Sequence, residues 1–164
     1  MITDLLVQQI ESCLPYEPNR EQSELLQQLA AFVLDGRDDS LFLLRGYAGT
    51  GKTSLVGALV KALTQLQSKV VLLAPTGRAA RRMAESTGHE DASTMHMALG
   101  LLGDFADYED AVEYLEAGFL NLDEVSMVDM HLGYEFFRRV KPASRILLVG
   151  DVDQLPSVGA GDVF

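Results

Sequence analysis

Residues 46–54, which read GYAGTGKTS, carry the clearest chemical signal in the sequence because they match the pattern G-x-x-x-x-G-K-[ST]. Glycines at this spacing let backbone N–H groups converge on phosphate oxygens, and the helix that follows adds its positive dipole end. The Lys52 ammonium can reach the β- and γ-phosphates of a nucleotide, and the Thr53 hydroxyl can coordinate Mg²⁺. The segment predicts a phosphate-binding loop, with an accidental glycine-rich turn as the alternative. The predicted cofactor-binding residues of this loop are Gly46, Ala48, Gly49, Thr50, Gly51, Lys52, Thr53 and Ser54.

Two adjacent acids follow a later apolar run, in the segment LDEVSM at residues 122–127. One acid at the end of a strand can hold Mg²⁺ through water, and the next can orient and deprotonate a water that attacks the γ-phosphate. Asp123 is therefore predicted to be the metal-side carboxylate, and Glu124 is predicted to be the general base. The alternative is that both acids begin the next helix, where negative charge favours the helix dipole.

The segment GDVDQLP, at residues 150–156, brings two acids and an amide to the end of another apolar run. Gln154 has both donor and acceptor atoms, so it can touch the γ-phosphate or the attacking water and is predicted to act with Lys52 and Glu124 in catalysis. The alternative is an ordinary turn, because Asp151, Asp153 and Pro156 are all good turn residues.

Apolar periodicity predicts the elements that must position these residues. Helices are expected at 2–14, 20–35, 52–66, 77–87 and 129–140, and buried strands at 41–46, 69–75, 119–124 and 145–151. The alternation of strands and helices predicts an α/β fold, a doubly wound parallel sheet with helices on both faces. Ligands of such sheets bind beyond the carboxyl ends of the strands, which is where each of these motifs lies.

Composition sets limits on the class of protein. The 164 residues predict one domain, and the hydrophobic fraction of 48% and charged fraction of 23% are ordinary for a globular protein. No apolar run suggests a membrane span, and the N-terminus makes a poor signal peptide, so a cytoplasmic protein without membrane contact is expected. Cys13 is the only cysteine, which excludes an internal disulfide. The net charge of −11 argues against a generic nucleic-acid binder, so DNA binding needs a local basic patch or a partner domain.

Five segments in one order are more specific than any of them alone: GYAGTGKT, APTGRAA, STMH, LDEVSM and GDVDQLPSVGAGDV. Together they resemble the first motor domain of superfamily 1 DNA helicases, and most closely the RecD-like, 5′-to-3′ branch. The resemblance implies a RecA-like P-loop NTPase domain at 37–164, preceded by helices at 1–36, in one structural domain overall. It also implies ATP and Mg²⁺ as cofactors, single-stranded DNA as the partner, and a role in recombination or repair.

The resemblance assigns further residues. Gln22, in NREQ, would hydrogen-bond the adenine edge, although Asn19 and Gln22 also have the spacing of a capping box, and both alternatives stay open. The predicted contacts with single-stranded DNA are Pro75, Thr76, Gly77, Arg78, Thr94 and His96. Arg81 and Arg82 are expected on a solvated helix face, and His96 can equally be a packed or solvent-facing residue.

Three features depart from the family. The stretch 101–117 has six acids and no base, so it is expected to be a solvated helix and loop rather than a DNA surface. Asn121 stands where the family usually has an aliphatic residue, and a buried asparagine needs partners. The family's second RecA-like domain, which carries an arginine finger, is missing from these residues. The chain is therefore expected to be a monomer that hydrolyses ATP slowly and does not unwind DNA alone, with two alternatives: a non-catalytic nucleotide- or DNA-binding module, or a P-loop ATPase of another branch.

Overall fold

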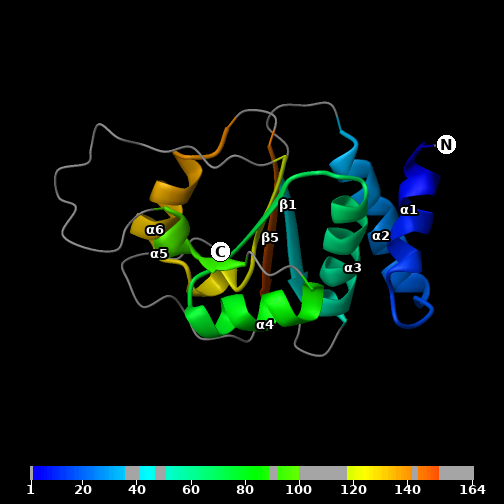
Figure 1. Cartoon of the computed structure of the whole chain (residues 1–164), viewed down its shortest axis with the longest axis horizontal. Helices are drawn as coiled ribbons and strands as arrows, with labels where there is room; N and C mark the ends of the chain where they lie inside the picture. The colour runs from blue at the N-terminus through cyan, green and yellow to red at the C-terminus, as the bar shows by residue number, and fades with distance from the viewer. Residues whose placement is uncertain are drawn as a thin grey trace.

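Five parallel strands form one sheet at the centre of the molecule (Figure 1). The computed structural model describes residues 2–35, 41–46, 51–88, 92–99, 118–141 and 144–151. The strands are β1 (Leu41–Gly46), β2 (Val70–Ala74), β3 (Ser93–Thr94), β4 (Phe119–Leu122) and β5 (Arg145–Asp151), in the spatial order β1-β5-β4-β2-β3. The predicted α/β fold with a parallel sheet is confirmed.

Strand β5 lies between β1 and β4, so the segments that follow these three strands meet at one edge of the sheet. The register pairs Gly46 of β1 with Asp151 of β5, and Leu148 of β5 with Leu122 of β4. Parallel strands place all their carboxyl ends at the same edge, where ligands of open α/β sheets bind. The strand order therefore brings Gly46 at the end of β1, the acid pair after β4 and the start of the GDVDQLP segment to neighbouring positions.

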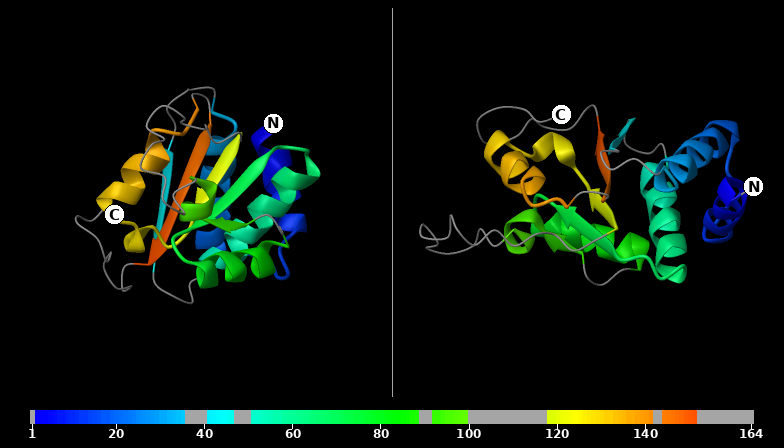
Figure 2. Two further views of the ribbon diagram at one scale, coloured as in Figure 1. Left: turned by 60° about the vertical axis from the view of Figure 1, so that its left-hand side comes forward. Right: turned by 90° about the horizontal axis from the view of Figure 1, so that it is seen from above.

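Alternating residues of the strands point into two separate apolar clusters, one on each face of the sheet. In β5, Leu147 and Val149 belong to one cluster, while Ile146 and Leu148 belong to the other. The first cluster includes residues of α1 (Ile2–Ser12), α2 (Arg20–Val33), α3 (Lys52–Gln65) and α4 (Gly77–Thr87). The second includes residues of α5 (Met95–Ala98), the short 3₁₀ helix η1 (Val125–Met127) and α6 (Met130–Phe137). Helices thus cover both faces of the sheet, and the further views show the two groups on opposite sides (Figure 2).

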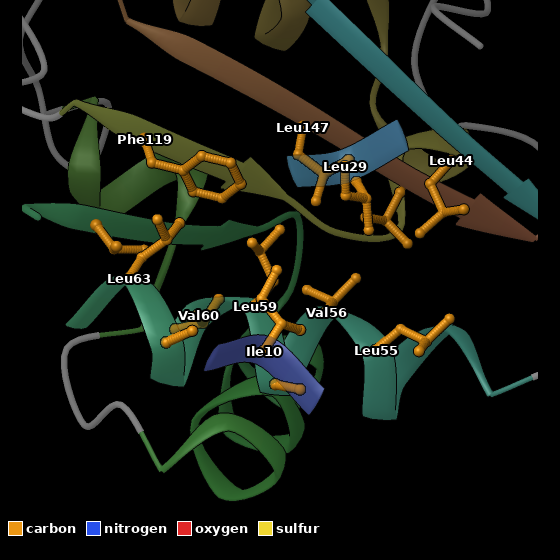
Figure 3. Packing of buried hydrophobic residues seen from close by; sticks show 14 of the residues in the cluster. Ile10, Leu29, Leu44, Leu55, Val56, Leu59, Val60, Leu63, Phe119 and Leu147 are labelled. Carbon is orange, nitrogen blue, oxygen red and sulfur yellow. The ribbon is translucent and has the colours of Figure 1, made fainter. Parts of the chain in front are cut away.

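Helix α3 is the central helix of the first cluster. Most of its residues from Leu55 to Leu63 are buried, and they pack between the sheet and α1 (Figure 3). Ile10 of α1 meets the helix on the side away from the strands, while Leu29 of α2 lies with Leu44 and Leu147 on the side of the sheet. This burial holds the first turn of α3, which contains Lys52 and Thr53, in a fixed position.

Side-chain caps explain where several helices begin. Asn19 starts α2 with a complete capping box, Thr76 accepts a hydrogen bond from the Ala79 amide at the start of α4, and Asp129 does the same for α6. Helix α4 ends at Gly88, which adopts the left-handed conformation typical of a terminating glycine.

The structure corrects some expected boundaries. The strand expected at 119–124 ends at Leu122, so the two acids lie beyond the ladder, and the helix expected at 129–140 covers only Met130–Phe137. The short elements β3, α5 and η1 were not predicted. The expectation for 101–117 lies outside the described residues, and the boundary between 1–36 and 37–164 stays a prediction. Among the described helices, none has the length and apolar character that crossing a bilayer requires.

Candidate active site

A cavity of about 490 Å³ lies at the edge of the sheet where the motifs meet. The start of α3, one side of α4 and the ends of β4 and β5 form its walls. The described residues that line it are Gly51, Lys52, Thr53, Ser54, Val56, Arg82, Met83, Ser86, Thr87, Asn121, Asp123, Glu124, Val149 and Gly150. The predicted phosphate-binding residues at the start of α3 therefore share one cavity with the predicted acid pair.

The glycine-rich segment connects the end of β1 to the first turn of α3. Strand β1 ends at Gly46, and Lys52 is the first residue of α3. Gly51 is the N-cap with a positive φ of 84°, and no side chain caps this helix. The first-turn N–H groups and the positive dipole end of α3 therefore lie at the cavity, which favours an anion there. The remaining loop residues of the prediction, Ala48, Gly49 and Thr50, lie outside the described residues.

Gln22 lies against the end of this loop. A Cβ atom on Gly51 would come 2.8 Å from Gln22 Nε2 and 3.3 Å from the Tyr16 hydroxyl, and the positive φ of Gly51 also favours glycine. Gln22 also forms the capping box: its Oε1 accepts from the Asn19 amide at 3.0 Å, and its own amide donates to Asn19 Oδ1 at 2.8 Å. The capping interpretation is confirmed, and the adenine-binding role stays a prediction. Tyr16 beside the loop was not predicted, because a lone tyrosine between two prolines carries no recognisable signal.

The acid pair follows β4 in a constrained backbone. The Asp123 amide donates to the Leu73 carbonyl at 2.9 Å, and Asp123 Oδ1 accepts from the Glu124 amide at 2.9 Å. Glu124 has the left-handed angles φ 50° and ψ 44°, which are uncommon for a non-glycine residue, and it is only 9% exposed. Glu124 is the N-cap residue of η1 but its side chain makes no capping hydrogen bond, and α6 begins later with Asp129 as its cap. The alternative in which both acids serve as helix-starting residues is therefore not supported.

Arg82 forms an ion pair with Glu124 across the cavity. Its Nη2 donates to Glu124 Oε1, and the two side chains come from α4 and from the end of β4, 42 positions apart. The Arg82 side chain is 64% exposed and the Glu124 side chain 11% exposed, so the arginine reaches inward from the rim of the cavity. Arg82 is exposed, as expected for a solvated helix face, but the sequence did not predict that its guanidinium also contacts the acid. Arg81 is exposed, as expected.

Asn121 forms part of the cavity wall and is nearly fully buried, with 1% of its surface exposed. Its Nδ2 lies 3.5 Å from the Met83 sulfur of α4. Among the residues that the structure describes, its Oδ1 has no hydrogen-bond partner. A buried asparagine is expected to have hydrogen-bond partners for both its amide nitrogen and its amide oxygen. In the described part of the chain, only the nitrogen of Asn121 has one.

The two predicted DNA-contact segments lie at neighbouring strand ends. β2 and β3 are paired with Ala74 opposite Thr94, so the residues that follow each strand are adjacent. Thr76 and Thr94 use their hydroxyls to cap α4 and α5. The other predicted DNA-contact residues, Pro75, Gly77, Arg78 and His96, lie at or beside these helix starts, and Gly77, Arg78 and His96 are exposed. Gln154 lies outside the described residues.

Comparison with known proteins points to one family. The family described as "AAA domain" matches residues 28–160. The chain is 41% identical over 143 residues to the ATP-dependent RecD2 DNA helicase of Deinococcus radiodurans, covering 87% of this chain and 19% of that protein. It is 36% identical over 144 residues to the RecBCD enzyme subunit RecD of Mycobacterium tuberculosis, covering 74% of this chain and 25% of that protein.

A solved structure has the same fold. The crystal structure of the Pif1 helicase from Candida albicans superposes with a TM-score of 0.60 at 25% identity, over 88% of this chain and 34% of the Pif1 chain. The chain thus spans between a fifth and about a third of the length of the proteins it matches.

Proposed function

Because the chain belongs to the AAA-domain family, as the first motor domain of a RecD-like superfamily 1 helicase, we propose that its cavity binds and hydrolyses ATP with Mg²⁺. The observation that carries the proposal is that the first turn of α3 and the acid pair after β4 line one cavity. These segments are far apart in sequence. If the glycine-rich segment were only a turn without a function, there would be no reason for two acids to line the same cavity.

The phosphates would bind at the start of α3. The N–H groups of the loop and first turn, from Gly46 through Ser54, would surround the phosphate oxygens, with the Lys52 ammonium on the β- and γ-phosphates. Gln22 would hydrogen-bond the adenine edge, a role that its position beside Gly51 supports.

The metal would be held by Thr53 and Asp123, which line the same cavity. This set fits Mg²⁺, which usually binds one or two protein carboxylates together with waters and substrate phosphates. The bound ion neutralises charge on the β- and γ-phosphate oxygens. Glu124 would then orient a water against the γ-phosphate and accept its proton, and Gln154 would contact the same water or phosphate.

Single-stranded DNA would lie along the adjacent ends of β2 and β3. The segment Pro75–Arg78 and the pair Thr94 and His96 would contact the sugar–phosphate backbone there, which fixes position without reading sequence. We place the protein in the cytoplasm and in recombination or repair, because its proposed substrate is DNA and its one cysteine is unpaired.

The residues present here form half of the proposed motor. ATP hydrolysis in this family is completed by a second RecA-like domain, and an arginine finger is worth about 10³ to 10⁵ in turnover. We therefore propose that the chain by itself, as a monomer, turns over ATP slowly and does not separate DNA strands.

Steady-state ATP hydrolysis, with and without a single-stranded oligonucleotide, tests the proposal. Glu124→Gln is the blank, and Glu11→Gln on α1 is the matched control, because it removes the same charge from a residue that does not line the cavity. We expect the wild type and Glu11→Gln to exceed the blank by the same small margin. Equal rates for Glu124→Gln and the wild type, in a protein that binds ATP, would rule out Glu124 as the base.

A further inference from the structure

The ion pair between Arg82 and Glu124 joins the helix of the proposed DNA site to the proposed base of the ATP site. Arg82 belongs to α4, whose start carries Thr76 and Arg78, and Glu124 follows β4 inside the cavity. Arg82 therefore connects α4 directly to the acid pair. A side chain in this position can couple the proposed DNA site to the proposed ATP site.

The ion pair with Arg82 holds Glu124, the proposed general base, in an inactive arrangement. Glu124 Oε1 accepts a charge-assisted hydrogen bond from the guanidinium, which is the stronger class of hydrogen bond. The bond occupies one acceptor site of the carboxylate and holds the carboxylate toward α4, so Glu124 does not turn freely toward a water at the γ-phosphate. The left-handed backbone of Glu124 and its buried side chain leave the carboxylate little freedom to turn away from Arg82.

Arg82, unlike Glu124, can leave the contact readily. Its side chain is 64% exposed, and ion pairs with an exposed partner contribute little because solvent competes for the charge. Arg78 lies four residues earlier, so both arginines project from the same side of α4. A DNA phosphate backbone bound at Arg78 would therefore compete with Glu124 for the guanidinium of Arg82.

We propose that Arg82 is a positioning residue that holds Glu124 at rest and moves to a DNA phosphate when single-stranded DNA lies along α4. DNA binding then frees the Glu124 carboxylate for the attacking water. The inference rests on the proposed function of the cavity and of α4, and it adds a physical reason for ATP hydrolysis to depend on DNA.

Affinity for DNA without nucleotide gives a direct test, because Glu124 and DNA would compete for one guanidinium. We would measure fluorescence anisotropy of a labelled oligothymidylate at fixed low salt for the wild type, Glu124→Gln, Arg82→Ala and the double variant. We expect Glu124→Gln to tighten binding about two- to five-fold in the wild-type background, the range that a weak ion pair allows. In the Arg82→Ala background, Glu124→Gln should not change the affinity for DNA. In the Arg82→Lys background, Glu124→Gln should tighten DNA binding again, by less than in the wild type.

Arg81→Ala is the matched control, because it removes the same charge from the neighbouring, exposed position of the same helix. Glu124→Gln should still tighten DNA binding in the Arg81→Ala background. Equal tightening in the Arg82→Ala background would overturn the inference, because it would reflect only the lost negative charge. Failure of the wild-type chain to bind the oligonucleotide would overturn it too.

Single-turnover hydrolysis without DNA supplies a second readout. Arg82→Ala should exceed the wild-type rate about two- to five-fold, because the base is no longer held. A rate equal to or below that of the wild type would contradict the resting role. Failure of the proposed function is recognised separately, since the Lys52→Ala variant would then bind ATP as well as the wild type does.

Discussion

Gly51 is the residue at which backbone conformation and packing restrict the side chain together. Its φ of 84° lies in the region that only glycine adopts without strain, and the Gln22 amide fills the space that a Cβ would need. Gly77, by contrast, has nothing within 4 Å of the position of a Cβ. The two glycines therefore differ in what they contribute, although the sequence presents both as parts of motifs.

Gly51→Ala is expected to weaken ATP binding by at least about ten-fold and to lower the unfolding free energy by about 1–2 kcal/mol, the cost of a left-handed alanine. The physical reason is that α3 must shift or Gln22 must move away from the loop. Isothermal titration and urea unfolding measure the two effects. Gly77→Ala is the control, and an equal loss of ATP affinity in both variants would show that the strain at Gly51 is not the cause.

Asn121→Val should raise the unfolding free energy by about 1 kcal/mol, because it removes a buried oxygen that has no hydrogen-bond partner in the described part of the chain. Valine also suits a buried strand better than asparagine does. Urea unfolding of the nucleotide-free protein measures the change. A loss of 1 kcal/mol or more would instead indicate that Asn121 Oδ1 binds a buried water or a group of the nucleotide.

At the scale of elements, helix α6 depends on one acid near its end. Glu135 forms ion pairs with Arg138 and Arg139, and its side chain is only 12% exposed. The hydrogen bond from Arg139 holds the pKa of Glu135 below its ordinary value, burial opposes this, and the charges of Arg139, Arg138 and His131 add to it. A carboxyl group whose pKa is lowered in the folded state stabilises the fold only while it is ionised.

The stabilisation by Glu135 should therefore be complete above its unfolded pKa of about 4.5 and disappear as the pH falls through the lower folded value. We expect Glu135→Gln to lower the melting temperature at pH 7 by about 2–4 °C, the effect of roughly 1 kcal/mol in a domain of this size. The difference from the wild type should shrink as the pH falls through this lower folded value. Glu24→Gln, in an exposed pair with Arg20, is the control and should change little. A difference that persists unchanged at low pH would contradict this explanation.

Most elements could be predicted from the sequence because their ends carry local signals. Helix α4 was predicted with its observed bounds, since Thr76 and Gly88 mark its start and stop, and β1 was predicted because its apolar run ends at glycine. Strand β3 and helix α5 are too short to show a period. Strand β4 ends early because Asp123 and Glu124 leave the ladder for a turn, which an apolar pattern does not mark.

The candidate site could be predicted in its parts but not in its contacts. Lys52, Thr53, Asp123 and Glu124 were placed at strand ends, and parallel pairing is enough to bring such ends together. The Arg82–Glu124 ion pair depends on how α4 packs over the sheet, and the contact of Gln22 with Gly51 depends on how α2 packs beside α3. These are tertiary contacts with no local pattern, which is why Arg82 was assigned to solvent.

At the scale of the whole molecule, the two apolar clusters hold the sheet between helices, while the candidate active-site cavity lies at one edge of the sheet. The first cluster joins α1 and α2 to α3, so the N-terminal helices support the turn that would bind phosphate. The net charge of −11 confines attraction for DNA to local cations such as those of α4. The chain covers about a fifth to a quarter of the length of its RecD relatives, so movement along DNA is proposed only for a longer motor.

The central claim is that the cavity between α3, α4 and the acid pair binds MgATP through Lys52. Isothermal titration of ATP in the presence of Mg²⁺ tests it most directly, with Lys61→Ala on the same helix as the matched control. We predict one site per chain, lost in Lys52→Ala and unchanged in Lys61→Ala, with both variants folded. Equal ATP affinity in the wild type and Lys52→Ala would contradict the account.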